Sequence, residues 1–181
     1  MNAPSSFRLL GPALLISTLV AVAPMSATAL TAPNVVVIDA NLVTSGQPPV
    51  SALENLKAEG VEAVIYLAPA TVSDAVKGEP DIVSRQGIEF IHIPIPFETP
   101  SESHFEAVSS ALQRLQGKKV LVHCQVNMRA STMVFLFRVL HRKDSPATAY
   151  DAVTRVWSPQ GPWRDMVQDL LKMRGVAFEL Y

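Results

Sequence analysis

Residues 120–131 read VLVHCQVNMRAS, and this stretch decides the fold class and the chemistry that the sequence predicts. A run of β-forming residues ends at Cys124, the only cysteine of the chain, and a short polar loop then leads to Arg129. The pattern predicts a strand, an anion-binding loop and a helix. Backbone N–H groups at a helix N-terminus, His123 and Arg129 all favour a thiolate over a thiol. We therefore expect a cysteine nucleophile that attacks an oxyanion such as a phosphate ester.

The composition is that of one globular domain with a local anion site. The chain has 181 residues, and 49% of them are hydrophobic, enough for an apolar core. Its formal net charge is -1 and it has no block of like charges, so nucleic acid is not an expected partner. No spacing of histidines, cysteines or carboxylates is typical of a metal site, and we expect neither a metal nor another cofactor.

The first 29 residues differ from the rest of the chain. Arg8 precedes an apolar run over residues 9–23, and small residues follow up to Ala29. This pattern predicts a secretory signal peptide over residues 1–29 that is cleaved after Ala29, which places the protein in the periplasm or outside the cell. The apolar run is shorter than the ~20 residues of a membrane span. We therefore expect no stable membrane insertion after cleavage, with an uncleaved anchor as the alternative.

The single cysteine is informative in such a compartment. Export into an oxidising environment favours disulfides, but one cysteine cannot form a bridge within the chain. Cys124 is therefore expected to be a free thiol. The alternative is a buried cysteine that acts only as a small apolar side chain, but a packing residue does not require a loop position between a histidine and an arginine.

Apolar strands alternate with helices along residues 30–181. We expect strands at residues 35–38, 42–43, 63–67, 88–93 and 119–123, and helices at residues 50–59, 80–86, 100–116, 130–141, 146–156 and 163–173. Thr99 is the expected N-cap of the third helix, with Glu102 completing a capping box. This alternation predicts a single three-layer α/β domain with a mainly parallel central sheet flanked by helices. Ligands of such sheets bind at the carboxyl ends of the strands, where Cys124 falls.

Three motifs resemble the cysteine-dependent protein-tyrosine and dual-specificity phosphatases. They are TSGQP at residues 44–48, VHCQVNMRAS at residues 122–131, and the segment from Trp157 to Trp163. They are most similar to a bacterial branch that includes domains attached to β-lactamase-like hydrolases, and the resemblance spans residues 34–172. It implies a phosphatase-like domain over residues 30–181, without a cofactor, that acts on a phosphorylated protein or small molecule.

The resemblance also implies roles for individual residues. Cys124 would attack phosphorus and form a phosphocysteine intermediate, and Arg129 would bridge two oxygens of the phosphate. The expected phosphate-binding residues are His123, Gln125, Val126, Asn127, Met128, Arg129, Ala130 and Ser131. The family places an acid in the loop before the long third helix, where this chain has Glu98. Asp74 and Asp81 are less well placed in the sequence.

The loop departs from the family pattern in ways that leave other functions open. Four residues separate Cys124 from Arg129 instead of five, and the loop glycine is absent, although Asn127 tolerates a left-handed backbone. Ala130 stands where a hydroxyl side chain is usual. A pseudophosphatase that binds an oxyanion without turnover is one alternative, and a rhodanese-like sulfurtransferase, which often has a four-residue spacing, is another. The sequence does not determine the oligomeric state.

Four other features are interpreted mainly as structural. His123 could be a hydrogen-bonded core residue or could orient the loop, and the two roles are compatible. His92 lies in an apolar strand and is expected to be structural. Trp157 and Trp163 are expected to pack against the core, and residues 45–48 are expected to form a turn that could border the pocket.

Overall fold

The carboxyl ends of four parallel strands meet at one edge of a five-stranded sheet. A computed structural model describes residues 30–181 together with Met1, so the predicted signal peptide lies outside the described residues apart from Met1. The strands are β1 (Val36–Asp39), β2 (Leu42–Ser45), β3 (Ala63–Tyr66), β4 (Glu89–His92) and β5 (Val120–His123), in the order β1-β2-β5-β3-β4. Only β1 is antiparallel to its neighbour. The prediction of a mainly parallel sheet is confirmed.

The register aligns the last residues of the parallel strands. Tyr66 is paired with His92 on one side and with His123 on the other, and Ser45 is paired with His123. Because successive residues of a strand point to opposite faces, these four side chains lie in one row. The row sits at the edge of the sheet from which the predicted anion loop departs.

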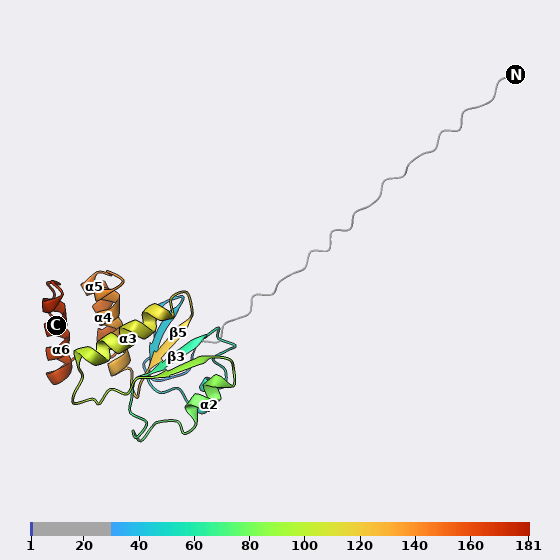
Figure 1. Cartoon of the computed structure of the whole chain (residues 1–181), viewed down its shortest axis with the longest axis horizontal. Coiled ribbons are helices and arrows are strands. Elements are labelled where there is room, and N and C mark those ends of the chain that lie inside the picture. Colours follow the sequence, from blue (N-terminus) through green and yellow to red (C-terminus); the bar gives the residue numbers. More distant parts are fainter. Residues whose placement is uncertain (2–29) are drawn as a thin grey trace.

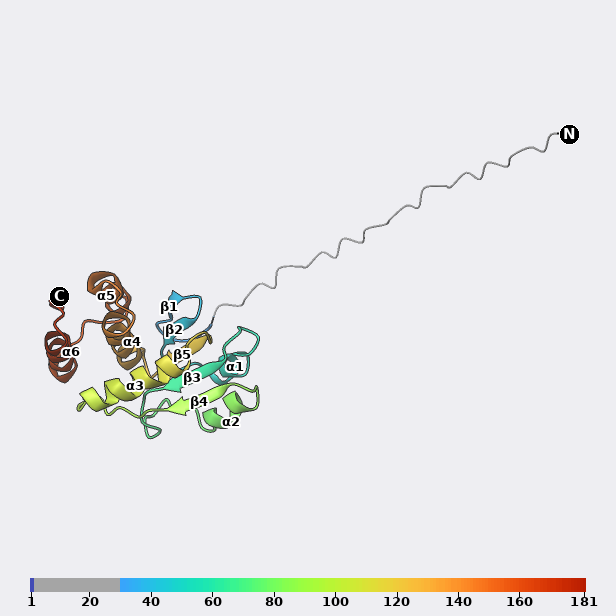
Figure 2. The same cartoon turned by 45° about the horizontal axis from the view of Figure 1, so that its top comes forward.

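Helices cover both faces of the sheet (Figures 1 and 2). One face carries the helices α3 (Glu102–Arg114), α4 (Met128–Leu140), α5 (Pro146–Thr154) and α6 (Gly161–Met173), and the other carries α1 (Val50–Leu53) and α2 (Glu79–Ser84). In α4 every residue except Met128 and Arg138 is buried. The apolar sequence of α4 therefore makes it the central helix of the larger core, and the three-layer α/β prediction is confirmed.

Two helix ends differ from the sequence-based expectation. The first helix ends at Leu53 rather than near residue 59, because the Asn55 side chain donates to the carbonyl of Ser51 and the chain continues in turns. The third helix begins at Glu102, and its N-cap is Ser101, whose Oγ accepts the backbone N–H of His104. The prediction of Thr99 as the N-cap, with a capping box at Glu102, is therefore wrong.

The structure also bears on membrane insertion. Among the described residues, none of the helices combines the length and the hydropathy that a bilayer-spanning segment requires.

Candidate anion site at the carboxyl ends of the strands

Cys124 directly follows β5 and is fully buried. Its backbone N–H donates to the carbonyl of Ser45 at 3.2 Å, which fixes the start of the loop against β2. The loop ends at Asn127, the N-cap residue of α4, which has a left-handed backbone with φ of 72°. Asparagine is one of the few residues that adopts this conformation readily, so Asn127 allows the turn that the usual glycine would allow.

The outer side of the loop is bonded to the segment over residues 33–47. The carbonyl of Gln125 accepts the backbone N–H of Gln47 at 2.9 Å, and the carbonyl of Val126 accepts the amide of Asn34 at 3.0 Å. The Asn127 side chain donates to the carbonyl of Asn34. Since the C=O and N–H of one peptide unit point in opposite directions, carbonyls bound on the outside leave the following N–H groups directed away from that wall.

Several backbone N–H groups on the inner side of the loop have no partner among the described residues. No described residue accepts a hydrogen bond from the N–H groups of Gln125, Met128, Arg129 and Ala130, whereas an antiparallel bridge pairs Val126 with Gly46. The first hydrogen bond of α4 runs from the Ser131 N–H to the carbonyl of Asn127. Consecutive free N–H groups that lead into a helix N-terminus are a binding site for an anion. These donors belong to the loop and helix start that directly follow Cys124.

Arg129 lies in the first turn of α4 with only 4% of its surface exposed. Its Nε donates to the carbonyl of Ile95 at 2.8 Å, and its Cζ lies 5.1 Å from the centre of the Phe97 ring. Trp157 and Trp163 pack against Phe97 at 5.8 and 5.7 Å between ring centres. The two tryptophans therefore support the ring that covers the guanidinium, in addition to their predicted packing.

Gln125 connects the guanidinium to a carboxylate in another loop. Its Oε1 accepts a hydrogen bond from Arg129 Nη1 at 3.3 Å, and its Nε2 donates to Asp74 Oδ1 at 2.8 Å. Asp74 belongs to the segment between β3 and α2 and is exposed. This segment therefore borders the site, although its sequence carries no recognisable motif.

His123 faces a buried carboxylate on the other face of the sheet. Its Nε2 lies 2.7 Å from Glu79 Oε1, with side-chain exposures of 0% and 3%. The two atoms are close, but their angles do not fit a hydrogen bond, and neither atom has another partner among the described residues. Gln47 Nε2 donates to the other oxygen, Oε2, of Glu79 at 2.8 Å. Glu79 therefore links His123, which precedes Cys124, to Gln47, whose backbone N–H binds the carbonyl of Gln125.

Tyr66 lies beside these charged groups. Its ring stacks on that of His123 at 4.7 Å, and its hydroxyl is buried without a partner among the described residues. Burial, together with the nearby Glu79, Asp74 and Cys124, raises the pKa of Tyr66 to about 12, and Arg129 acts in the opposite direction. The Tyr66 hydroxyl is thus sensitive to the charges of the groups around the loop.

The structure brings most of the residues predicted from the sequence together. His123, Cys124 and residues 125–131 form one continuous strand end, loop and helix start. The Ser131 hydroxyl donates to the carbonyl of Met128, so it is occupied within the helix. Glu98 is exposed, and among the described residues no hydrogen bond or ion pair involves its side chain. The sequence analysis did not identify Asn34 or Glu79, which the fold brings to the site, whereas Gln47 lies in the turn at residues 45–48 that was expected to be able to border the pocket.

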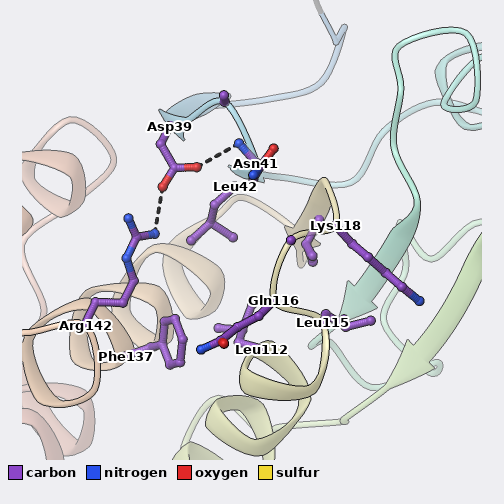
Figure 3. A pocket seen from close by; sticks show the side chains of 12 residues that line it. Asp39, Asn41, Leu42, Leu112, Leu115, Gln116, Lys118, Phe137 and Arg142 are labelled. Atoms are coloured by element: carbon purple, nitrogen blue, oxygen red, sulfur yellow. Dashed lines mark hydrogen bonds and ion pairs between the residues drawn. The ribbon is translucent and has the colours of Figure 1, made fainter.

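Two cavities lie outside the loop at residues 124–129, one near it and one far from it. One of about 300 Å³ lies between residues 75–80 and the side chains of Tyr66 and His92. The larger, about 480 Å³, lies at the opposite ends of the strands, near Leu42 and Val120 (Figure 3). The Asp39–Arg142 ion pair of 2.7 Å borders it. Its position at the amino ends of β2 and β5 separates it from Cys124.

Comparisons with known proteins agree with this geometry. The family model described as "DSP-PTPase phosphatase fused to NAD+ Kinase" matches residues 16–165. A DUF442 protein from Shewanella putrefaciens CN-32, described as a candidate phosphatase, is 26% identical, with a TM-score of 0.73 over 80% of this chain and 95% of that one. None of the curated proteins compared with the chain matches it.

Two further solved structures share the fold at lower identity. Tk-PTP in its active form is 24% identical, with a TM-score of 0.66 over 77% of this chain and 97% of that one. PTPMT1 in complex with PI(5)P is 18% identical, with a TM-score of 0.64 over 76% of this chain and 94% of that one.

Proposed function

The chain belongs to the family of dual-specificity and protein-tyrosine phosphatases described by the matching model, and from that premise we propose that it hydrolyses phosphate monoesters through Cys124. The observation that carries the proposal is the set of free backbone N–H groups of Gln125, Met128, Arg129 and Ala130, in the loop and first helical turn that follow the buried Cys124. Backbone N–H groups and a guanidinium bind the oxygens of a phosphate, and a thiolate attacks its phosphorus. The expected substrate is a phosphorylated protein or small molecule.

The proposed reaction has two steps. In the first, the Cys124 thiolate attacks phosphorus, the S–P bond forms, the P–O ester bond breaks, and the leaving oxygen takes a proton from an acid. In the second, water attacks phosphorus and gives a proton back to the acid, the S–P bond breaks, and inorganic phosphate and the thiolate are released. The free N–H groups and Arg129 hold the phosphate oxygens throughout. Glu98 is the proton donor that the sequence suggests.

Hydrolysis of p-nitrophenyl phosphate tests this proposal. We expect the purified protein to release phosphate, and Cys124→Ser and Arg129→Ala each to abolish release. Arg155→Ala serves as the matched control, because Arg155 is exposed at the end of α5 and its loss should leave the rate unchanged. Release that persists in Cys124→Ser would disprove the covalent mechanism.

One observation favours binding without turnover as the second candidate function. Ala130 follows Arg129, and the Ser131 hydroxyl is bonded to the helix carbonyl of Met128, so neither supplies a free hydroxyl to assist departure of the thiolate. A phosphate-binding module would show saturable binding of inorganic phosphate by calorimetry, lost in Arg129→Ala, with no hydrolysis of any phosphate ester. Hydrolysis that depends on Cys124 would exclude this alternative.

We also propose that residues 1–29 direct export to the periplasm. The support is the sequence alone: Arg8, the apolar run after it and the small residues before the cleavage site. Cell fractionation should find the protein in the periplasm, and N-terminal sequencing of that protein should begin at Leu30. A protein that retains residues 1–29 in the cytoplasm would contradict the proposal.

A further inference from the structure

The structure gives Asp74 a position that its place in the sequence does not suggest. One side-chain amide, that of Gln125, lies between the carboxylate of Asp74 and the guanidinium of Arg129, at 2.8 Å from the first and 3.3 Å from the second. Asp74 is therefore connected to the phosphate-binding arginine through a single residue of the anion loop. Neither Glu98 nor Asp81 has a comparable link among the described side chains.

The in-line geometry of phosphoryl transfer defines where an acid must lie. The nucleophile and the leaving oxygen occupy opposite sides of phosphorus. The nucleophile, Cys124, is fully buried at the end of β5, so the leaving oxygen must lie on the solvent side of a bound phosphate. A carboxyl group that reaches this oxygen must be exposed at the entrance to the site, as Asp74 is.

The other carboxylate near the thiol is already engaged. Glu79 is buried, contacts His123 through one oxygen and accepts a hydrogen bond from Gln47 through the other. Because Glu79 is only 2% exposed, it does not lie on the solvent side of the site. Asp74 has one hydrogen bond, to an amide, and its second oxygen has no partner among the described residues.

We propose that Asp74, on the segment after β3, is the general acid of the reaction, an inference that rests on the proposed phosphatase function. As the P–O ester bond breaks, the Asp74 carboxyl transfers its proton to the leaving oxygen, so the product departs as a neutral alcohol or phenol. In the second step the Asp74 carboxylate takes a proton from the attacking water as the S–P bond breaks. The carboxyl group is thereby regenerated.

The dependence on the leaving group tests this role in Asp74→Asn. Phenolate is a poor leaving group and needs the proton, whereas p-nitrophenolate leaves largely without it. We expect kcat/KM, which reports on the first step and not on hydrolysis of the phosphocysteine, to fall by about 10²-fold or more for phenyl phosphate, within the range of general acid catalysis, and to fall much less for p-nitrophenyl phosphate. A merely structural role for Asp74 would lower both rates by the same factor, and Asp74→Glu should recover part of the rate on phenyl phosphate.

Asp81→Asn is the matched control, because Asp81 is an exposed aspartate on α2, and both rates should remain unchanged in it. An equal loss on both substrates in Asp74→Asn, no loss at all, or the selective loss in Glu98→Gln instead would overturn the assignment of Asp74 and leave the phosphatase function intact. Absence of turnover by the native protein on either ester would overturn both.

Discussion

At Gly46 the chain passes so close to the anion loop that a side chain has no room. A Cβ atom there would lie 2.7 Å from the carbonyl oxygen of Gln125 and 2.9 Å from Cβ of Pro33. We expect Gly46→Ala to displace the loop, to reduce phosphatase activity and to lower the free energy of unfolding by about 1–3 kcal/mol, the usual cost of overpacking. Urea unfolding and kinetics on one preparation check both effects.

Gly87→Ala is the control that separates this steric effect from backbone strain. Gly87 has φ of 73°, and a Cβ atom at this position would have no neighbour within 4 Å, so its replacement should cost ~1–2 kcal/mol of stability through the left-handed backbone alone. Its kcat should remain native. If Gly46→Ala keeps native kinetics as well, the close approach does not position the loop.

Tyr66 gives a pH-dependent prediction. Burial raises its pKa from 10.0 to about 12, so the native state retains the phenol proton more tightly than the unfolded chain does. The resulting stabilisation is fully present below pH 10 and is lost as the pH rises through about 12. In Tyr66→Phe the unfolding free energy should fall less over this range, as urea titrations at several alkaline pH values would show. The same fall in both proteins would contradict the prediction.

The sequence identified the residues of the site that are contiguous and missed those that are distant. His123, Cys124 and Arg129 could be recognised because a strand, a loop and a helix follow one another within one segment. Asn34 and Asp74 bind this loop from 92 and 51 residues away. No local pattern marks Asn34, and Asp74 is in the sequence only a less well placed candidate for the acid. Such contacts depend on the order of strands in the sheet, which periodicity alone does not reveal.

Two residues before α3 carry a hydroxyl that could cap this helix, and only one of them does so. The Ser101 hydroxyl accepts the backbone N–H of His104, whereas the exposed Thr99 lies before the helix. We expect Ser101→Ala to lower the free energy of unfolding by about 1 kcal/mol, as loss of an N-cap does, and Thr99→Ala to leave it unchanged. Denaturant unfolding of both variants measures the difference, and an equal effect would mean that the cap does not stabilise α3.

The apolar pattern predicted the existence and order of the described elements more reliably than their ends. The strands and the long helices lie where periodicity placed them, because each buries a continuous apolar face or run. The ends of α1 and α3 depend on single hydrogen bonds made by Asn55 and Ser101. Several residues near each end could make such a bond, so the sequence alone does not select one.

A bound anion should stabilise the entire fold. The free N–H groups of the loop and Arg129 exist as a site only in the folded chain, so inorganic phosphate at 100 times its dissociation constant should raise the unfolding free energy by ~2.7 kcal/mol. Thermal unfolding with increasing phosphate measures this effect. Arg129→Ala should remove most of it, and equal protection of the variant would indicate nonspecific salt stabilisation.

Residues 33–47 hold the outer side of the loop. The proposed nucleophile, Cys124, therefore acquires its surroundings only when folding is complete. The Asn34–Val126 and Asn34–Asn127 bonds span 92 and 93 residues, and contacts of such sequence separation form only when most of the chain is ordered. A nascent or translocating chain would carry Cys124 as an ordinary thiol without an oriented set of donors. The proposed reaction at Cys124 thus requires the finished tertiary structure. Partial unfolding of the hairpin formed by β1 and β2 would abolish it before the core unfolds.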